Sequence, residues 1–227
     1  MMVHMETRTQ RAERRADALS KERIVEAAIG ILDAGGDSAL TLRALMARLA
    51  TGSGAIYWHV ASMSELVAAA TNDIIARAMA GVVSGAEPRE AIRAIALGVF
   101  DAIDAHPWAG AQLSREPWQP AVLQILEGAG QQIQALGVPE RAQFDCASAL
   151  VNYVLGLAGQ YAAGARLLPR ETDRSAFLAT VAAGWAQLDP AQHPFMRQVA
   201  AQLPGHDDRE QFLAGIDLIM AGIGTAR

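Results

Sequence analysis

The 227-residue sequence has little cysteine, few aromatic residues and no long uninterrupted apolar segment. A single cysteine, Cys146, excludes an internal disulfide framework and is typical of the reducing cytoplasm. Aromatic residues make up 5% of the chain, and alanine supplies much of its 52% apolar content, which favours helices. We therefore expect an all-α cytoplasmic protein.

Segments that target or anchor a chain in membranes are also missing. The N-terminus lacks the apolar stretch of a signal peptide. The most apolar segment, 146–168, is interrupted by Ser148, Asn152 and Gln160, whereas a membrane span needs about 20 predominantly apolar residues. We expect a helix buried in protein and no membrane partner.

Motifs of common enzyme classes are absent, including the P-loop, G-x-G-x-x-G, H-E-x-x-H and G-x-S-x-G. The five histidines do not cluster at the spacing of metal ligands. We expect no enzyme, metal site or cofactor. A helical-bundle enzyme or small-molecule carrier that uses an apolar cavity is the alternative.

Charge divides the chain unevenly. Residues 1–66 contain eight basic and eight acidic residues, so residues 67–227 carry the whole net charge of −5. Residues 8–23 contain six basic and three acidic residues, a pattern that indicates contact with an anion or else a solvated tail. We expect a flexible basic arm at 1–19, a small domain at 20–66 and a larger helical domain at 67–227.

Helix-start signals recur along the chain. Ser20 and Thr41 can cap two helices, 53–60 reads as a third, and Ser62 with Glu65 forms a capping box for a helix that runs to about Met79. Prolines and apolar periodicity then predict helices at 88–106, 108–115, 117–136, 139–168 and 207–222.

Residues 41–60 fit the helix-turn-helix pattern of two short helices joined by a glycine-containing turn. In its second helix Ile56 and Val60 fall on one side, and Trp58 falls on the opposite side with two small residues. Tyr57 and His59 flank that outer face, which suits the major groove of DNA. An ordinary helical hairpin with exposed aromatic residues is the alternative.

These segments resemble the tetracycline-repressor (TetR) family of transcriptional regulators. The similarity covers Arg23-Ile-Val-Glu-Ala-Ala, 42–49, Ile56-Tyr-Trp-His-Val and Ser64-Glu-Leu. Less specific similarity continues in His106-Pro-Trp, Tyr153-Val-Leu-Gly and 212–217. The resemblance implies an Ω-shaped dimer in which the third helix reads an operator and the larger domain holds an effector.

The resemblance also implies which residues contact DNA. Phosphates are assigned to Arg43, Tyr57 and His59, and base edges to Ser53, Gly54, Ala55 and Trp58. Two positions depart from the family: Gly52 replaces a polar residue, and Met63 replaces a lysine that contacts a phosphate. These departures leave open an interaction protein whose DNA-binding half has decayed.

The tetracycline site of the family needs a histidine ahead of an arginine-proline pair, but 112–117 reads QLSREP. We therefore do not expect a magnesium–tetracycline effector. The expected pocket combines apolar, aromatic and polar residues, namely Phe100, His106, Trp108, Gln112, Trp118, Asn152 and Tyr153.

A dimer interface is expected on two helices. Small residues on helix 139–168 permit close approach, and helix 207–222 with the residue that follows it carries an apolar stripe. The expected interface residues are Ala149, Gly156, Phe212, Ile216, Ile219 and Ile223. The sequence as a whole predicts a homodimeric, ligand-responsive repressor that binds a palindromic double-stranded DNA operator and is released by a small apolar or aromatic effector.

Overall fold

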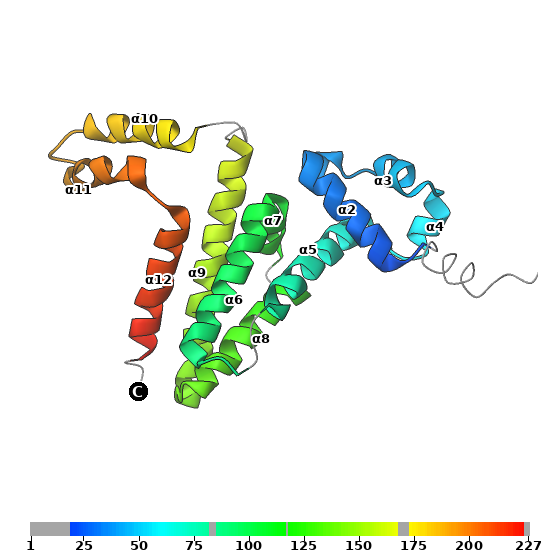
Figure 1. The fold of residues 1–227 in the computed structure, drawn as a ribbon, viewed down its shortest axis with the longest axis horizontal. Coiled ribbons are helices and arrows are strands. Elements are labelled where there is room, and N and C mark those ends of the chain that lie inside the picture. Colours follow the sequence, from blue (N-terminus) through cyan, green and yellow to red (C-terminus); the bar gives the residue numbers. More distant parts are fainter. Residues whose placement is uncertain (1–18, 82–84, 117, 168–172, 225–227) are drawn as a thin grey trace, which may run out of the picture. The chain divides into compact units, whose positions relative to one another are not determined.

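The computed structural model describes residues 19–81, 85–116, 118–167 and 173–224. These residues form helices and no strand (Figure 1), which confirms the predicted all-α class. The chain divides into two compact units, 1–74 and 75–227. This division lies inside helix α5 (Met63–Ala80), and the predicted boundary after Leu66 lies earlier in the same helix. The predicted arm, except for Leu19, lies outside the described residues.

Unit 1 contains α2 (Lys21–Gly35), the 3-10 turn η1 (Asp37–Ala39), α3 (Leu42–Leu49), α4 (Ser53–Tyr57) and the start of α5 (Met63–Ala80). The predicted caps are present. Ser20 Oγ accepts from the Arg23 N–H at 3.3 Å, and Thr41 Oγ1 accepts from the Ala44 N–H at 3.1 Å. Each helix contributes fully buried apolar side chains to one core, among them Ile24, Ala28, Leu45, Ile56 and Leu66.

Unit 2 is built around the long helix α9 (Glu140–Leu167). It packs against α6 (Pro88–Ala105), α7 (Pro107–Arg115), α8 (Pro120–Ala135) and α12 (Asp208–Ile223). Their apolar faces form one core that also includes residues of α5. The predicted helices are confirmed, with ends that differ by up to three residues.

Three further elements lie between α9 and α12: α10 (Arg174–Ala186), α11 (Pro194–Val199) and the 3-10 segment η2 (Ala200–Gly205). α10 packs along η2 and α11 (Figure 1). The sequence pattern predicts no helix over 174–186. The reason is visible in the structure, because α10 buries only Leu178 and Ala182 and so lacks a continuous apolar stripe.

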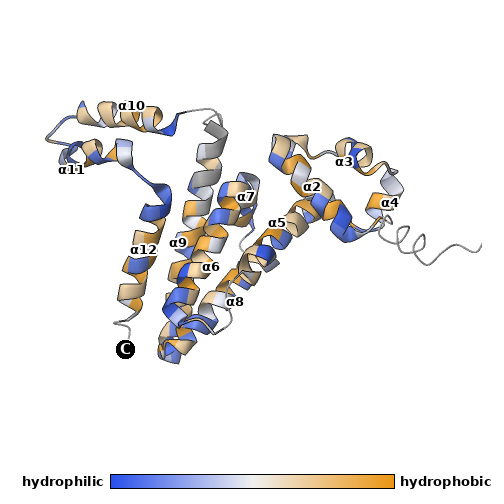
Figure 2. Cartoon of the chain, in the orientation of Figure 1, coloured by the Kyte–Doolittle hydropathy of each residue, from blue (hydrophilic) through white to orange (hydrophobic). Residues whose placement is uncertain are grey.

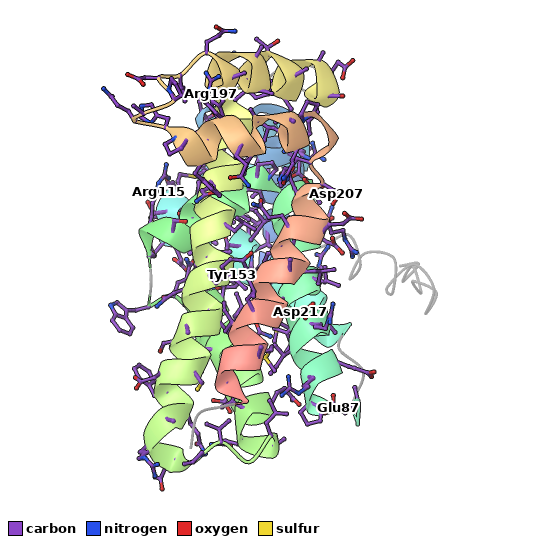
Figure 3. The ribbon with its side chains drawn as sticks, turned by 90° about the vertical axis from the view of Figure 1, so that its left-hand side faces the viewer. Glu87, Arg115, Tyr153, Arg197, Asp207 and Asp217 are labelled. Atoms are coloured by element: carbon purple, nitrogen blue, oxygen red, sulfur yellow. The ribbon has the colours of Figure 1, made fainter. Side chains whose placement is uncertain are left out.

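An aromatic stack fastens α12 to its neighbours. The ring of Phe212 lies between Phe100 of α6, with centroids 4.9 Å apart, and Tyr153 of α9, at 5.7 Å and 11° from parallel. The Tyr153 hydroxyl donates to the Phe212 carbonyl at 3.2 Å, and burial raises the pKa of this phenol. Figure 3 shows Tyr153 between the two helices.

Ion pairs also join α12 to α6. Arg93 pairs with Asp217 at 2.8 Å, and Arg209 pairs with Asp101 at 3.2 Å. Both pairs are about half exposed, so water screens them and they contribute little stability. The first turn of α12 is hydrophilic, while the rest of the helix is largely apolar (Figure 2). Burial of its apolar face therefore holds α12 in place.

Gly215 is expected to be indispensable to this packing. A Cβ atom there would lie 2.1 Å from the Tyr153 hydroxyl oxygen and 2.3 Å from its ring. Because the stacked ring cannot swing aside, Gly215→Ala should lower the free energy of unfolding by about 1–3 kcal/mol. Gly130→Ala in α8 is the control, since nothing lies within 4 Å of its Cβ position and alanine should raise stability by about 0.5–1 kcal/mol. Urea denaturation at one protomer concentration measures both, and equal effects would contradict the packing argument.

Candidate nucleic-acid interface and effector site

The short helix α4 presents the residues that the sequence predicted for DNA contact. Ile56 and Val60 are fully buried, as expected. Trp58 is 86% exposed and Tyr57 is 50% exposed, while His59 is half-buried. Ser53, Gly54 and Ala55 are exposed on α4, which ends at Tyr57; Trp58 is its C-cap, and His59 and Val60 follow it. The segment 53–60 thus combines one anchored apolar side with an outer surface of small residues and aromatic rings.

The turn between α3 and α4 depends on an unusual backbone conformation at Ala50. Its φ of 49° and ψ of 45° are left-handed, and among the described residues it alone has a positive φ without being glycine. The turn closes through bonds from the Ala50 and Thr51 N–H groups to the Met46 carbonyl. Ala50 therefore sets the direction in which α4 leaves α3.

A network of hydrogen bonds organises the turn between α4 and α5. The Glu65 N–H donates to Ser62 Oγ at 3.1 Å, which confirms the predicted cap. In return Glu65 Oε2 accepts from the Ala61 N–H at 2.6 Å, one residue before the cap. Glu65 Oε1 pairs with Lys21 Nζ at 3.2 Å. The Ala61 bond, followed by the Lys21 bond and charge, lowers the pKa of Glu65.

Other predicted contacts differ in their surroundings. Arg43 is exposed on α3, and Met63 is half-buried in the first turn of α5. Gly52 caps α4 without any side-chain hydrogen bond, so it leaves that terminus open. The guanidinium of Arg48 packs against α2, because its Cζ lies 3.0 Å from the Cβ position of Gly30. Arg48 therefore has a packing contact within unit 1.

The seven residues predicted for a pocket fall into separate groups. Phe100 and Tyr153 stack on Phe212 within the core. Trp108 is buried with its ring edge-on to His106 at 6.1 Å, and Gln112 is also buried. Trp118 is 83% exposed and Asn152 is exposed. A small apolar cavity in unit 2, of about 10 Å³, is lined by none of them; its lining residues are Ile92, Ile95, Ala96, Ile125, Ala129, Leu150, Val151, Val154 and Ile216.

Gln119 is a buried polar residue that sequence reasoning missed. Its Nε2 donates to the Gln112 carbonyl at 3.0 Å, while its buried Oε1 has no hydrogen-bond partner among the described residues. A buried acceptor without a partner is costly. Gln119 also occupies the N-cap position of α8 without capping it, a place that normally favours serine, threonine, aspartate or asparagine. That mismatch is the signal that could have identified it.

The predicted dimer interface needs a correction on α12. Phe212, Ile216 and Ile223 are buried in the core of their own protomer, and Ile219 packs against that core. The three buried side chains face α6 and α9, so they are covered within one protomer. Ala149 and Gly156 are exposed on α9, as the prediction requires. The exposed side of α12 is instead marked by Leu218, which is 76% exposed.

In the part of the chain that the structure describes, no helix is long and apolar enough to cross a membrane. No group of three or more histidine, cysteine, aspartate or glutamate side chains there is placed to hold a metal ion.

The described residues thus form a helix-turn-helix unit and a larger unit of packed helices, the architecture of helical DNA-binding regulators. The family model described as "Tetracyclin repressor-like, C-terminal domain" matches residues 85–227. The chain belongs to this TetR family, which consists of transcriptional regulators and not of enzymes. An HTH-type transcriptional regulator of Saccharopolyspora erythraea is 29% identical over 150 residues, which are 66% of this chain and 64% of that protein. The match thus spans slightly less than two thirds of that relative.

Several solved structures show the same fold. The transcriptional regulator SCO7222, a TetR from Streptomyces coelicolor, is 49% identical with a TM-score of 0.82, over 92% of this chain and 100% of that one. ActR of Streptomyces coelicolor in complex with actinorhodin is 23% identical with a TM-score of 0.74, over 90% and 95% of the chains. Mycobacterium smegmatis BioQ with its natural double-stranded DNA operator is 23% identical with a TM-score of 0.62, over 91% and 99%. The last two likenesses show the fold alone.

Ala50→Gly is expected to stabilise unit 1. Glycine adopts left-handed backbone freely, whereas alanine pays about 1–2 kcal/mol there, so the free energy of unfolding should rise by about 0.5–1 kcal/mol after the greater chain entropy of glycine is deducted. The same substitution at Ala47, exposed within α3, should lower it by about 1 kcal/mol. Thermal denaturation followed by circular dichroism compares them, and a loss in both variants would contradict the role of this turn.

Proposed function

We propose that the protein is a cytoplasmic transcriptional repressor that binds double-stranded operator DNA as a homodimer and is released by a small apolar or aromatic effector. The observation that carries the proposal is the outer surface of α4. Exposed Tyr57 and Trp58 are expensive to leave in water, and the buried Ile56 and Val60 hold them there. A major groove accommodates such a helix, with small residues close to the bases and ring side chains at the rims.

Each residue of this surface has a proposed role. Tyr57, His59 and Arg43 hold phosphates, which position the domain without reading sequence. Ser53, Gly54, Ala55 and Trp58 face base edges, where the small residues allow close approach and Trp58 can contact a thymine methyl group. Met63 lies beside a phosphate without adding charge. The DNA operator held by BioQ supports this partner for a protein of the same fold.

Homodimerisation is proposed through the exposed sides of α9 and α12, which pack together (Figure 3). Ala149 and Gly156 on α9 allow close approach, and Leu218 of α12 and Phe144 of α9 are 76% and 71% exposed. Large exposed apolar side chains on neighbouring helices favour contact with a second copy of the protein, which would cover them. A two-fold dimer matches a palindromic operator whose half-site centres lie about 34–36 Å apart or a multiple of that.

An effector site is proposed in unit 2. The apolar cavity, of about 10 Å³, has room for about one water molecule, so the helices that line it must separate to admit an effector that is mainly apolar. The buried Gln119 Oε1, which has no hydrogen-bond partner among the described residues, would accept from a donor of such a ligand. The actinorhodin bound by ActR supports a small aromatic molecule as the kind of effector. Coupling of about 1–3 kcal/mol between the two sites is typical. Binding that quenches Trp108 fluorescence without lowering DNA affinity would instead favour a carrier.

Tyr57→Ala tests the DNA interface. With one phosphate hydrogen bond lost per subunit, binding to a duplex from upstream of the protein's own gene should weaken by about 2–10-fold per subunit, as fluorescence anisotropy measures. The free energy of unfolding should change by less than about 1 kcal/mol, because the ring is outside the core. Phe195→Ala is the control, since this ring is 68% exposed in unit 2 and should leave DNA affinity unchanged. Equal losses of stability and affinity for Tyr57→Ala would mean that the ring serves the fold.

Leu218→Glu tests the dimer. A buried carboxylate at the centre of the proposed interface is costly, so sedimentation at micromolar concentration should show a monomer. Leu123→Glu is the matched control, because Leu123 is 50% exposed on α8, outside the proposed interface. We expect that variant to remain dimeric. A Leu218→Glu variant that sediments as the wild-type dimer would place the interface elsewhere.

A further inference from the structure

Lys21 is the only lysine of the 227-residue chain, in which every other permanent side-chain cation is an arginine. It lies in the first turn of α2, yet its ammonium meets the turn between α4 and α5. Lys21 Nζ is 3.2 Å from Glu65 Oε1, and the other oxygen of this carboxylate accepts from the Ala61 N–H at 2.6 Å. Glu65 therefore links the ammonium of Lys21 to the backbone that follows His59 and Val60.

The contact with Glu65 brings the first turn of α2 beside the turn that follows His59 and Val60. The neighbouring Glu22 has its pKa lowered chiefly by its own backbone N–H and by the Ser20 hydroxyl. This neighbourhood belongs to unit 1 alone.

A contribution to the stability of the fold does not explain the Lys21–Glu65 ion pair well. The side chains of Lys21 and Glu65 are 48% and 41% exposed, and pairs this open to water stabilise proteins little. Glu65 already serves the turn through the Ala61 N–H, with or without Lys21. What Lys21 adds is a positive charge beside the α4–α5 turn, where Met63 offers none.

We propose that Lys21 binds a backbone phosphate of DNA beside the α4–α5 turn, and that Glu65 positions its ammonium in the free protein. This inference rests on the proposed DNA binding and adds a contact to it. A compact ammonium on a flexible stem can turn from a half-exposed carboxylate to a phosphate oxygen without a change of backbone. Lys21 then lies between the Glu65 carboxylate and the DNA phosphate. The negative charge of Glu65 limits how strongly the surface beside the α4–α5 turn attracts DNA.

Salt dependence of DNA affinity measures the proposed contact. Because phosphate contacts carry no sequence information, a labelled 30-base-pair duplex of random sequence is a sufficient probe. In fluorescence anisotropy over a NaCl series, Lys21→Met should bind more weakly and flatten the plot of log K against log salt by about 0.9 per subunit. Lys21→Arg should restore the wild-type slope, because it restores the charge.

Glu65→Gln is the matched control, because it breaks the same ion pair and keeps an oxygen for the Ala61 N–H. If the pair served only the fold, Lys21→Met and Glu65→Gln would change DNA affinity in the same direction. The proposal expects opposite directions, with tighter binding for Glu65→Gln. If the wild type binds DNA and Lys21→Met keeps the wild-type slope of log K against log salt, only the proposed role of Lys21 is overturned. A wild type without salt-dependent binding overturns the proposed function itself.

Amine acetylation tests the contact in the wild-type protein, so no variant needs to fold. As the sole lysine, Lys21 yields an unambiguous peptide in mass spectrometry after treatment with an acetylating N-hydroxysuccinimide ester. Saturating random-sequence duplex should slow acetylation of Lys21 several-fold. Acetylation at the same rate with and without the duplex contradicts a phosphate contact.

Discussion

The burial of Ile56 and Val60 is the constraint on which the proposed DNA interface depends. Helix α4 has five residues, too few to be stable alone, so contact with the core of unit 1 must hold it in place. With these two side chains inward, the helical repeat directs Trp58 outward and places Tyr57 beside it. One packing choice thus decides which residues the domain can present to a ligand.

Two turns complete the orientation of α4, and they do so by different means. Before the helix, Ala50 accepts an unfavourable left-handed backbone so that α3 can end abruptly. After it, Ser62 and Glu65 satisfy backbone donors, and Glu65 also reaches Lys21 at the start of α2. The carboxylate of Glu65 on α5 therefore joins the α4–α5 turn to the start of α2.

In unit 2, α12 is held from one side and free on the other. Phe212 fills the space between Phe100 and Tyr153, and Gly215 lets the Tyr153 ring come close. This buries the apolar stripe of α12 and leaves Leu218 on the opposite face. The packing within one protomer thus selects which side of the helix is available to a second copy.

The sequence by itself determined the all-α class, most helix limits and the inward side of α4, because caps at Ser20, Thr41 and Ser62 and the helical repeat are local properties of the chain. It could not reveal α10, which lacks a strong apolar stripe, or the left-handed turn at Ala50. Only the tertiary structure decided that Phe212, Ile216 and Ile223 are buried by their own protomer, and that Gln119 holds an unpartnered oxygen. The physical reason is that an apolar stripe indicates which face of a helix must be covered, but it does not identify the neighbour that covers it.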